Sequence, residues 1–327
     1  MSKVVGIGTP SEKRVPSTAS LRARPRSTAS RRVGPATAPE NVSSLITSLP
    51  SWLRDLDRDI AGRYVRLATP LNEYGYDPFG FDKETARYPA LVMAAFYRYW
   101  FRVETHGIEN VPGQGPVLIV GNHAGNTFAW DAAMVGTAVF LEADPPRLGR
   151  GLGEFYLPTI PFFNEFMARV GSVVGTPENC RQLFERGECV LVFPEGARGF
   201  VKPYRKAYQL QRFGLGFLRL ALEHGVPILP VGIVGGEEQS PGLADVKWLG
   251  RLIGSPAFPI TLTMPLLGPL GFIPLPVKFH LSFGPLMRFD GAFDAEDAEL
   301  QPKVDEVKKE IQRLIQIGLS RRQSWFF

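Results

Sequence analysis

Apolar positions divide the chain into a helical first part and a longer part in which strands and helices alternate. Apolar residues recur at helical spacing over 51–66, and residues 86–103 form a second, apolar and aromatic helix. Farther on, apolar and amphipathic runs predict strands at 117–120, 190–193, 228–234 and 278–283, and helices at 131–140, from 177, at 206–224 and at 303–317. This alternation predicts an α/β fold with a mostly parallel central sheet flanked by helices.

Two apolar stretches raise the question of a membrane. Residues 252–277 contain no charged side chain, but six prolines exclude a regular transmembrane helix, because proline removes a helical hydrogen bond and clashes with the preceding turn. We expect an irregular apolar surface that either packs on the core or enters one leaflet. The helix over 86–103 is too short and too interrupted by charge to span a bilayer. Its Trp, Tyr and Arg side chains suit a membrane interface as well as a protein core.

Positive charge concentrates at the start of the chain. Residues 1–42 hold eight Lys or Arg against two Glu, so the formal charge of +5 arises there. Their Ser, Ala, Pro and Arg content without apolar periodicity predicts a disordered basic tail, which either binds anionic lipid headgroups, resembles a transit peptide, or is a solvated linker. We therefore divide the chain into this tail (1–42), a helical membrane-proximal segment (43–105) and an α/β domain (106–327).

Cysteine usage argues against a disulfide framework and against a zinc site. The two cysteines, Cys180 and Cys189, lie nine positions apart with no further ligand nearby, which fits a reducing compartment. We expect two buried thiols and no metal.

A histidine follows the first strand of the α/β domain at its carboxyl end, where parallel sheets place their ligands. His123 stands there among small residues and is one of four histidines in the chain. It can act as a general base, and Asp131 can bind its other ring nitrogen and fix the tautomer. Eight positions along one helix would separate them by about 12 Å, so residues 124–130 must form a loop. The alternative is a structural histidine followed by an acidic residue at a helix start.

A second polar sequence, Phe193-Pro-Glu-Gly-Ala-Arg198, follows the strand over 190–193. Its proline and glycine turn the backbone sharply and present the Glu and Arg in a tight corner. Arginine binds phosphate through paired hydrogen bonds, and Lys202 and Arg205 are close in sequence. The alternative is a Glu–Arg pair on a surface turn.

Three ordered blocks resemble those of the glycerolipid acyltransferase family, whose best-known members are the 1-acylglycerol-3-phosphate acyltransferases. They are Asn122-His123 with a downstream Asp, the 193–198 sequence, and Val226-Pro-Ile-Leu-Pro-Val231, and the resemblance covers about residues 95–290. It implies that His123 is the catalytic base and that Asp131 orients it. Residues 163–169 are similar to a fourth block that supplies an arginine. By resemblance, the acceptor is then bound by a further set of residues: Asn122, Arg169, Glu195, Gly196 and Arg198.

The chain departs from this family in the spacing between the histidine and the aspartate. The family places four residues between them, whereas seven stand between His123 and Asp131, and Phe128 occupies the usual position of the acid. Since Asp131 is the only acid between His123 and Glu142, we expect a longer loop that still brings it to the imidazole.

The resemblance implies an O-acyltransferase of phospholipid biosynthesis, peripheral on a membrane surface and cytoplasmic. It would move a fatty acyl group from acyl-CoA or acyl-carrier protein to a lysophospholipid hydroxyl, with no cofactor and no nucleic-acid partner. The alternatives are a neutral or other lysolipid acceptor, and a non-catalytic membrane-binding protein of the same fold. A serine hydrolase is disfavoured because the chain has no Gly-x-Ser-x-Gly sequence, and nucleotide-binding enzymes because it has no glycine-rich phosphate loop.

Overall fold

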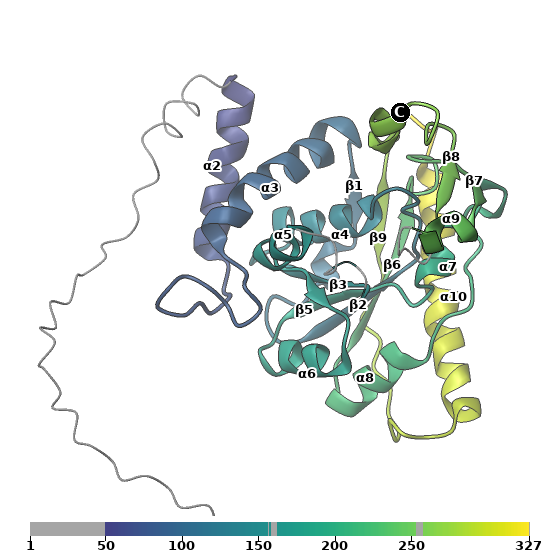
Figure 1. Ribbon diagram of the computed structural model, residues 1–327. Coiled ribbons are helices and arrows are strands. Elements are labelled where there is room, and N and C mark those ends of the chain that lie inside the picture. The colour runs from purple at the N-terminus through teal and green to yellow at the C-terminus, as the bar shows by residue number, and fades with distance from the viewer. Residues whose placement is uncertain (1–49, 156, 158–161, 253–257, 327) are drawn as a thin grey trace, which may run out of the picture. The chain divides into compact units, whose positions relative to one another are not determined.

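A computed structural model describes residues 50–155, 157, 162–252 and 258–326 (Figure 1). The predicted basic tail and the start of the predicted helical segment lie outside the described residues. The described part belongs to one compact unit, and the predicted boundary at residue 105 falls within it.

Seven strands form a mostly parallel sheet, which confirms the predicted α/β fold. The strands are β1 (Glu104–His106), β2 (Val117–Gly121), β3 (Gly149–Gly153), β4 (Val173–Val174), β5 (Cys189–Val192), β6 (Ile228–Val234) and β9 (His280–Phe283). Their order is β1-β9-β6-β2-β5-β3-β4, and β6 with β9 is the antiparallel pair among them. A separate antiparallel ribbon pairs β7 (Gly242–Asp245) with β8 (Pro259–Thr261).

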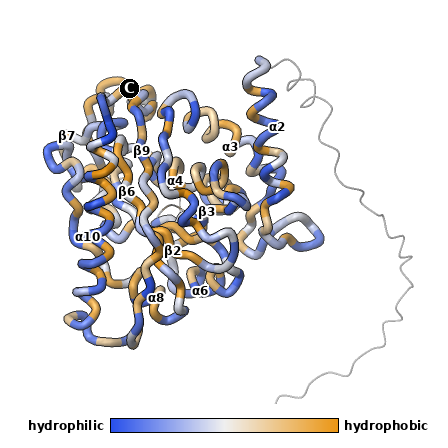
Figure 2. Tube along the Cα trace, turned by 180° about the vertical axis from the view of Figure 1, so that it is seen from behind, coloured by the Kyte–Doolittle hydropathy of each residue, from blue (hydrophilic) through white to orange (hydrophobic). Residues whose placement is uncertain are grey.

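Helices cover both faces of the sheet because successive strand residues point to opposite sides. In β2, Ile119 belongs to one apolar cluster and Leu118 to the other. The first cluster includes residues of α2 (Ser51–Arg66), α3 (Lys83–Ala95) and α4 (Trp130–Leu141), and the second includes residues of α6 (Pro177–Glu185), α8 (Gly216–His224) and α10 (Asp297–Arg321). The strands β2 and β6 are hydrophobic along their length, whereas α2 and α10 alternate in hydropathy (Figure 2).

The prediction of a helix over 206–224 was wrong in its first half. After a 3-10 turn at η4 (Tyr204–Lys206), the chain reaches α8 only at Gly216. Between them Tyr208 adopts a positive φ of 60°, the Gln211 N–H donates to Glu195 Oε2 and the Gly214 N–H donates to the Pro194 carbonyl. Tertiary partners therefore take the backbone groups that a helix would have used.

The aromatic helix predicted over 86–103 begins and ends earlier than expected. Asp82 caps α3 by accepting from the N–H groups of Glu84 and Thr85, which fixes its start. A π-helical turn, η1 (Phe96–Trp100), then widens the helix, and the Phe101 N–H donates to the Phe96 carbonyl five residues back.

The uncharged stretch 252–277 is irregular, as the prolines predicted. Its described residues form the end of α9 (Lys247–Leu252), β8 and a 3-10 turn, η5 (Gly268–Phe272). Large apolar side chains are exposed along it: Leu262, Leu266, Leu267, Leu270, Phe272 and Ile273. None of the helices within the described ranges is long and apolar enough to cross a membrane.

Candidate active site

The end of β2 is fixed to β6 by a side-chain amide. Asn122 is 1% exposed, donates its Nδ2 to the Ile233 carbonyl at 2.9 Å and accepts the Ile233 N–H at 2.8 Å. Both amide functions therefore bond to the backbone, and this geometry speaks against the expectation that Asn122 contacts an acceptor. It holds the chain at the point where His123 leaves the sheet.

The loop after His123 returns Asp131 to the imidazole, despite the widened spacing. His123 Nδ1 lies 2.6 Å from Asp131 Oδ2, and the same oxygen accepts the Ala124 N–H at 2.8 Å. The loop is anchored from outside: Gln239 Nε2 donates to the Gly125 carbonyl at 2.7 Å, and Asn126 Nδ2 donates to the Ser240 carbonyl at 2.8 Å. The sequence prediction of a loop that brings the two side chains together is confirmed.

Asp131 is placed to stay ionised although it is fully buried. Burial opposes its charge, but the His123 ring and the N–H groups of Ala124 and Ala132 outweigh burial and lower the pKa of Asp131. It lies in the first turn of α4, where the helix dipole also favours a carboxylate. A carboxylate on Nδ1 fixes the ring tautomer so that Nε2 is the acceptor.

The rest of the imidazole is held by two aromatic rings. Phe193 stacks on it with ring centres 4.3 Å apart and planes 13° apart, and Phe200 packs at 5.0 Å. The side chain of His123 is 14% exposed, and within the described residues Nε2 has no hydrogen-bond partner. The ring is thus oriented by protein on one edge and accessible on the other, which is the requirement for a general base.

Glu195 fixes the backbone at His123 by hydrogen bonding. It is 1% exposed, its Oε1 accepts the His123 N–H at 3.0 Å and its Oε2 accepts the Gln211 N–H at 2.7 Å. Both oxygens are bonded to backbone, so this side chain joins the two predicted motifs and is a positioning group. The expectation that it binds the acceptor does not fit this arrangement.

Glycines allow the corner after β5 to approach the histidine. Gly196 has φ 55° and ψ −149°, a conformation that is essentially restricted to glycine. A Cβ on Gly199 would lie 2.6 Å from Glu195 Cβ and 3.1 Å from His123 Cβ. Gly199 was not among the site residues predicted from the sequence, although it directly follows the 193–198 motif.

The predicted cations occupy different surroundings. Arg198 is exposed on α7 (Ala197–Phe200) and donates to the Arg212 carbonyl at 3.3 Å. Lys202 is buried, and its Nζ lies 2.8 Å from Glu237 Oε1, so it is not available to a phosphate. Arg169, at the end of α5 (Phe163–Arg169), stacks over the Tyr76 ring at 4.4 Å and donates to Glu165 at 3.3 Å, so its described contacts do not bring it to His123.

The loop after β6 contributes residues that the sequence analysis did not single out. Glu237, Glu238, Gln239 and Ser240 are all buried behind the 124–130 loop. Burial raises the pKa of Glu237, against the opposing effect of Lys202. The signal was present in the sequence, since a run of four polar residues follows the buried strand at 228–234 after two glycines.

A small cavity lies beside the corner. Its volume is about 230 Å³, and its lining includes Phe79, Leu157, Met167 and Glu154. A Cβ on Gly196 would lie 3.9 Å from Glu154 Oε1, which places one rim of the cavity next to the motif. Neither the helix predicted over 86–103 nor the described part of 252–277 contributes to its lining.

Comparisons with known proteins show sequence similarity to acyltransferases. The chain matches the family model "Acyltransferase" over residues 102–234. It is 36% identical over 293 residues to an uncharacterized protein of Mycobacterium tuberculosis, covering 88% of this chain and 78% of that protein. It is also 24% identical over 219 residues to the DGAT1/2-independent enzyme synthesizing storage lipids of Bos taurus, covering 66% and 60%. Among solved structures, 1-acyl-sn-glycerophosphate acyltransferase PlsC of Thermotoga maritima aligns with TM-score 0.47 and 18% identity over 84% of this chain and 97% of that one.

Proposed function

The chain belongs to the glycerolipid acyltransferase family and is an O-acyltransferase, and from this premise we propose that it acylates a lysophospholipid such as 1-acylglycerol-3-phosphate. The acyl donor is an acyl-CoA or an acyl-carrier protein. The observation that carries the proposal is the 2.6 Å contact between His123 Nδ1 and Asp131 Oδ2, with the other edge of the ring accessible.

In the proposed reaction, His123 Nε2 accepts the proton of the lysolipid hydroxyl while the hydroxyl oxygen attacks the thioester carbonyl. The carbonyl–sulfur bond then breaks, an ester forms, and the imidazolium returns the proton to the leaving thiolate. Asp131 stabilises the transient imidazolium. None of these proton transfers requires a cofactor.

Exposed arginines support an anionic acceptor. Arg198, Arg205 and Arg212 are all exposed on the segment that follows the corner at Gly196. Guanidinium groups bind phosphate through paired hydrogen bonds. With Glu195 bonded to backbone, Arg198 is the motif side chain placed to contact a headgroup, because its guanidinium has further N–H donors besides the one on the Arg212 carbonyl.

Two features support the lipid side of the reaction. The cavity beside Glu154 has an apolar lining suited to part of an acyl chain. The exposed leucines and Phe272 of 262–273 form an apolar surface of the kind that inserts into lipid, and we propose that it holds the enzyme on the cytoplasmic side of a membrane. Vesicle co-sedimentation checks the second point, because Leu266→Glu should reduce binding and leave folding unchanged.

A neutral acceptor is the second candidate, favoured by the similarity to the storage-lipid enzyme. The neutral and the phosphate-bearing acceptor are distinguished by assaying purified protein with labelled acyl-CoA and either lysophosphatidate or monoacylglycerol. We expect phosphatidate to be the product formed. We also expect Arg198→Ala to raise KM for lysophosphatidate by about 10-fold or more, because a hydrogen bond to a charged group is lost. A product only from monoacylglycerol, insensitive to Arg198→Ala, would overturn the phospholipid proposal.

The catalytic role is tested in the same assay. His123→Ala should lower kcat about 10²–10⁴-fold with circular dichroism unchanged, because general-base assistance is worth that much. His224→Ala is the matched control, since His224 lies in α8 and is not part of the site. Full activity of His123→Ala would refute the mechanism, whereas a wild type that forms no acyl product but binds vesicles as well as His123→Ala does would leave a membrane-binding role.

A further inference from the structure

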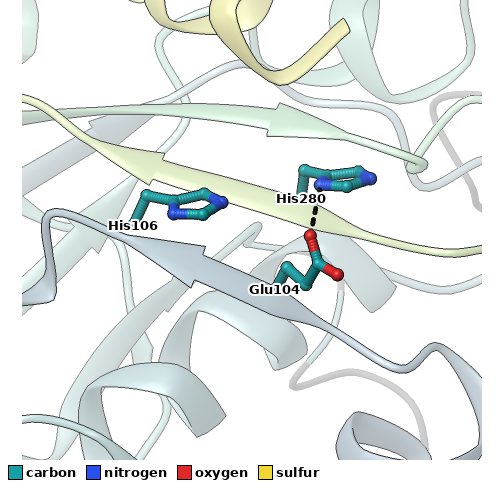
Figure 3. Close-up of side chains that lie close together, drawn as sticks. All are labelled: Glu104, His106 and His280. Atoms are coloured by element: carbon teal, nitrogen blue, oxygen red, sulfur yellow. Dashed lines mark ion pairs between the residues drawn. The ribbon is translucent and has the colours of Figure 1, made fainter. Parts of the chain in front are cut away.

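A cluster of metal-ligating side chains lies at one edge of the sheet, apart from His123. Glu104 and His106 project from β1, and His280 projects from the neighbouring strand β9 (Figure 3). Their potential ligand atoms all lie within 4.8 Å of one another. Within the described residues no other group of three His, Cys, Asp or Glu side chains gathers in this way.

The strand register creates the cluster. In the parallel β1–β9 pair, Glu104 is opposite His280 and His106 is opposite Ser282. Residues two apart in a strand share a face, so Glu104, His106 and His280 are aligned on the same side of the ladder. The backbone hydrogen bonds of the sheet therefore hold the positions from which the three side chains project.

Three buried imidazole nitrogens in this cluster have no hydrogen-bond partner among the described residues. His280 is 2% exposed, and neither of its ring nitrogens makes a hydrogen bond in the described part of the chain, nor does His106 Nε2. A buried polar atom without a partner costs about 1–3 kcal/mol, so a native protein seldom leaves three together. Each of these imidazole nitrogens can coordinate a metal ion through its lone pair.

Glu104 completes the donor set. Its Oε2 lies 3.4 Å from His280 Nδ1, while its Oε1 lies 2.6 Å from Lys278 Nζ. The carboxylate is half exposed, so the cluster is open on one side. Lys278 can hold one oxygen as an outer partner while the other binds a metal, an arrangement that orients carboxylate ligands in many metal sites.

We propose that Glu104, His106 and His280 bind one divalent transition-metal ion, with Zn²⁺ the best match to this ligand set. Two imidazoles and one carboxylate are a common zinc set, and neither Mg²⁺ nor Ca²⁺ favours imidazole nitrogen. Tetrahedral Zn²⁺ with bonds of about 2.1 Å keeps its ligand atoms about 3.4 Å apart, so atoms within 4.8 Å of one another need to approach by at most about 1.4 Å. The bound ion links the edge strand β1 to β9 and leaves a coordination position for solvent.

The site is independent of the proposed acyl transfer. His123 and Asp131 are not members of the cluster, and the proton transfers above do not involve it. Failure of one proposal therefore leaves the other standing.

The experiment uses the untagged full chain after treatment with a chelator. Zn²⁺ titration by calorimetry should give one site per chain, and Zn²⁺ should raise the melting temperature. Glu104→Gln and His106→Gln should each weaken Zn²⁺ binding by more than about 10-fold and abolish most of the thermal shift. Glu104→Gln is the safer variant, since its half-exposed side chain is not needed for the core.

A matched control comes from another histidine–glutamate pair. His224 Nε2 and Glu223 Oε2 lie 3.8 Å apart, so His224→Gln removes a comparable pair and should leave Zn²⁺ binding unchanged. Co²⁺ bound in place of Zn²⁺ should show d–d absorption without the thiolate charge-transfer band that cysteine ligands produce. The assignment is overturned if the chelated protein takes up no Zn²⁺, if Glu104→Gln and His106→Gln bind it as tightly as the wild type, or if a thiolate band appears.

Discussion

Replacing the aspartate behind the imidazole with asparagine tests the proposed mechanism most directly. In Asp131→Asn one oxygen can still accept from His123 Nδ1 and the Ala124 N–H, but the amide nitrogen then faces the Ala132 N–H, which Oδ1 accepts in the native chain at 2.8 Å. The reverse orientation places the amide against His123 and fixes the wrong tautomer. Either orientation removes the negative charge.

The size of the effect follows from the charge that His123 acquires during reaction. The imidazolium and the carboxylate are in direct contact, and at a charge separation of about 4 Å an effective dielectric constant of about 20 gives an attraction of about 4 kcal/mol. Loss of that attraction in the transition state corresponds to a fall in kcat of about 10³-fold. KM for the acceptor should change little, because the attraction is needed chiefly in the transition state, where His123 takes up the proton.

The assay is steady-state transfer from acyl-CoA to lysophosphatidate, with circular dichroism and urea unfolding to verify the fold. Asp297→Asn is the matched control, because Asp297 also lies in the first turn of a helix but is largely exposed and pairs with Arg219. It should retain wild-type activity. An Asp131→Asn enzyme within about threefold of wild-type kcat would refute the proposed role of the contact.

Three further outcomes follow from the same geometry. Glu195→Gln leaves one side-chain oxygen to accept from two backbone N–H groups. We therefore expect a loss of about 1–3 kcal/mol in unfolding free energy and a lower kcat. A change confined to KM would instead indicate that Glu195 binds the lysolipid. Gly196→Ala should destabilise the fold by about 1–3 kcal/mol in urea titrations, whereas Gly216→Ala, with open space around its Cβ and no positive φ, should not. The pKa of Asp131 is lowered by folding, so its stabilising effect is present above the unfolded pKa of about 3.9 and lost as pH falls through the folded value. The advantage of the wild type over Asp131→Asn in unfolding free energy should therefore shrink on acidification, and an advantage that grows would contradict the sign.

The sequence by itself determined the fold class and the pairing of His123 with Asp131. Continuous apolar runs such as residues 117–120 and 228–234 are sufficient to indicate buried parallel strands, because each strand carries its own hydrophobic pattern. His123 and Asp131 were identified because they follow such a strand and because no other acid intervenes before Glu142. The two cysteines are buried and free, as expected.

Only the tertiary structure decided which partners the remaining motif residues bond to. Asn122 and Glu195 have side chains of the kind that bind substrates, yet their polar atoms bond to backbone elsewhere in the chain. Asn122 bonds to Ile233, and Glu195 bonds to His123 and Gln211. The helix expected from residue 206 is replaced in its first half by an irregular segment for the same reason. Local propensity differs by less than 1 kcal/mol per residue between ordinary side chains, whereas a buried N–H without a partner costs more, so the distant partner prevails.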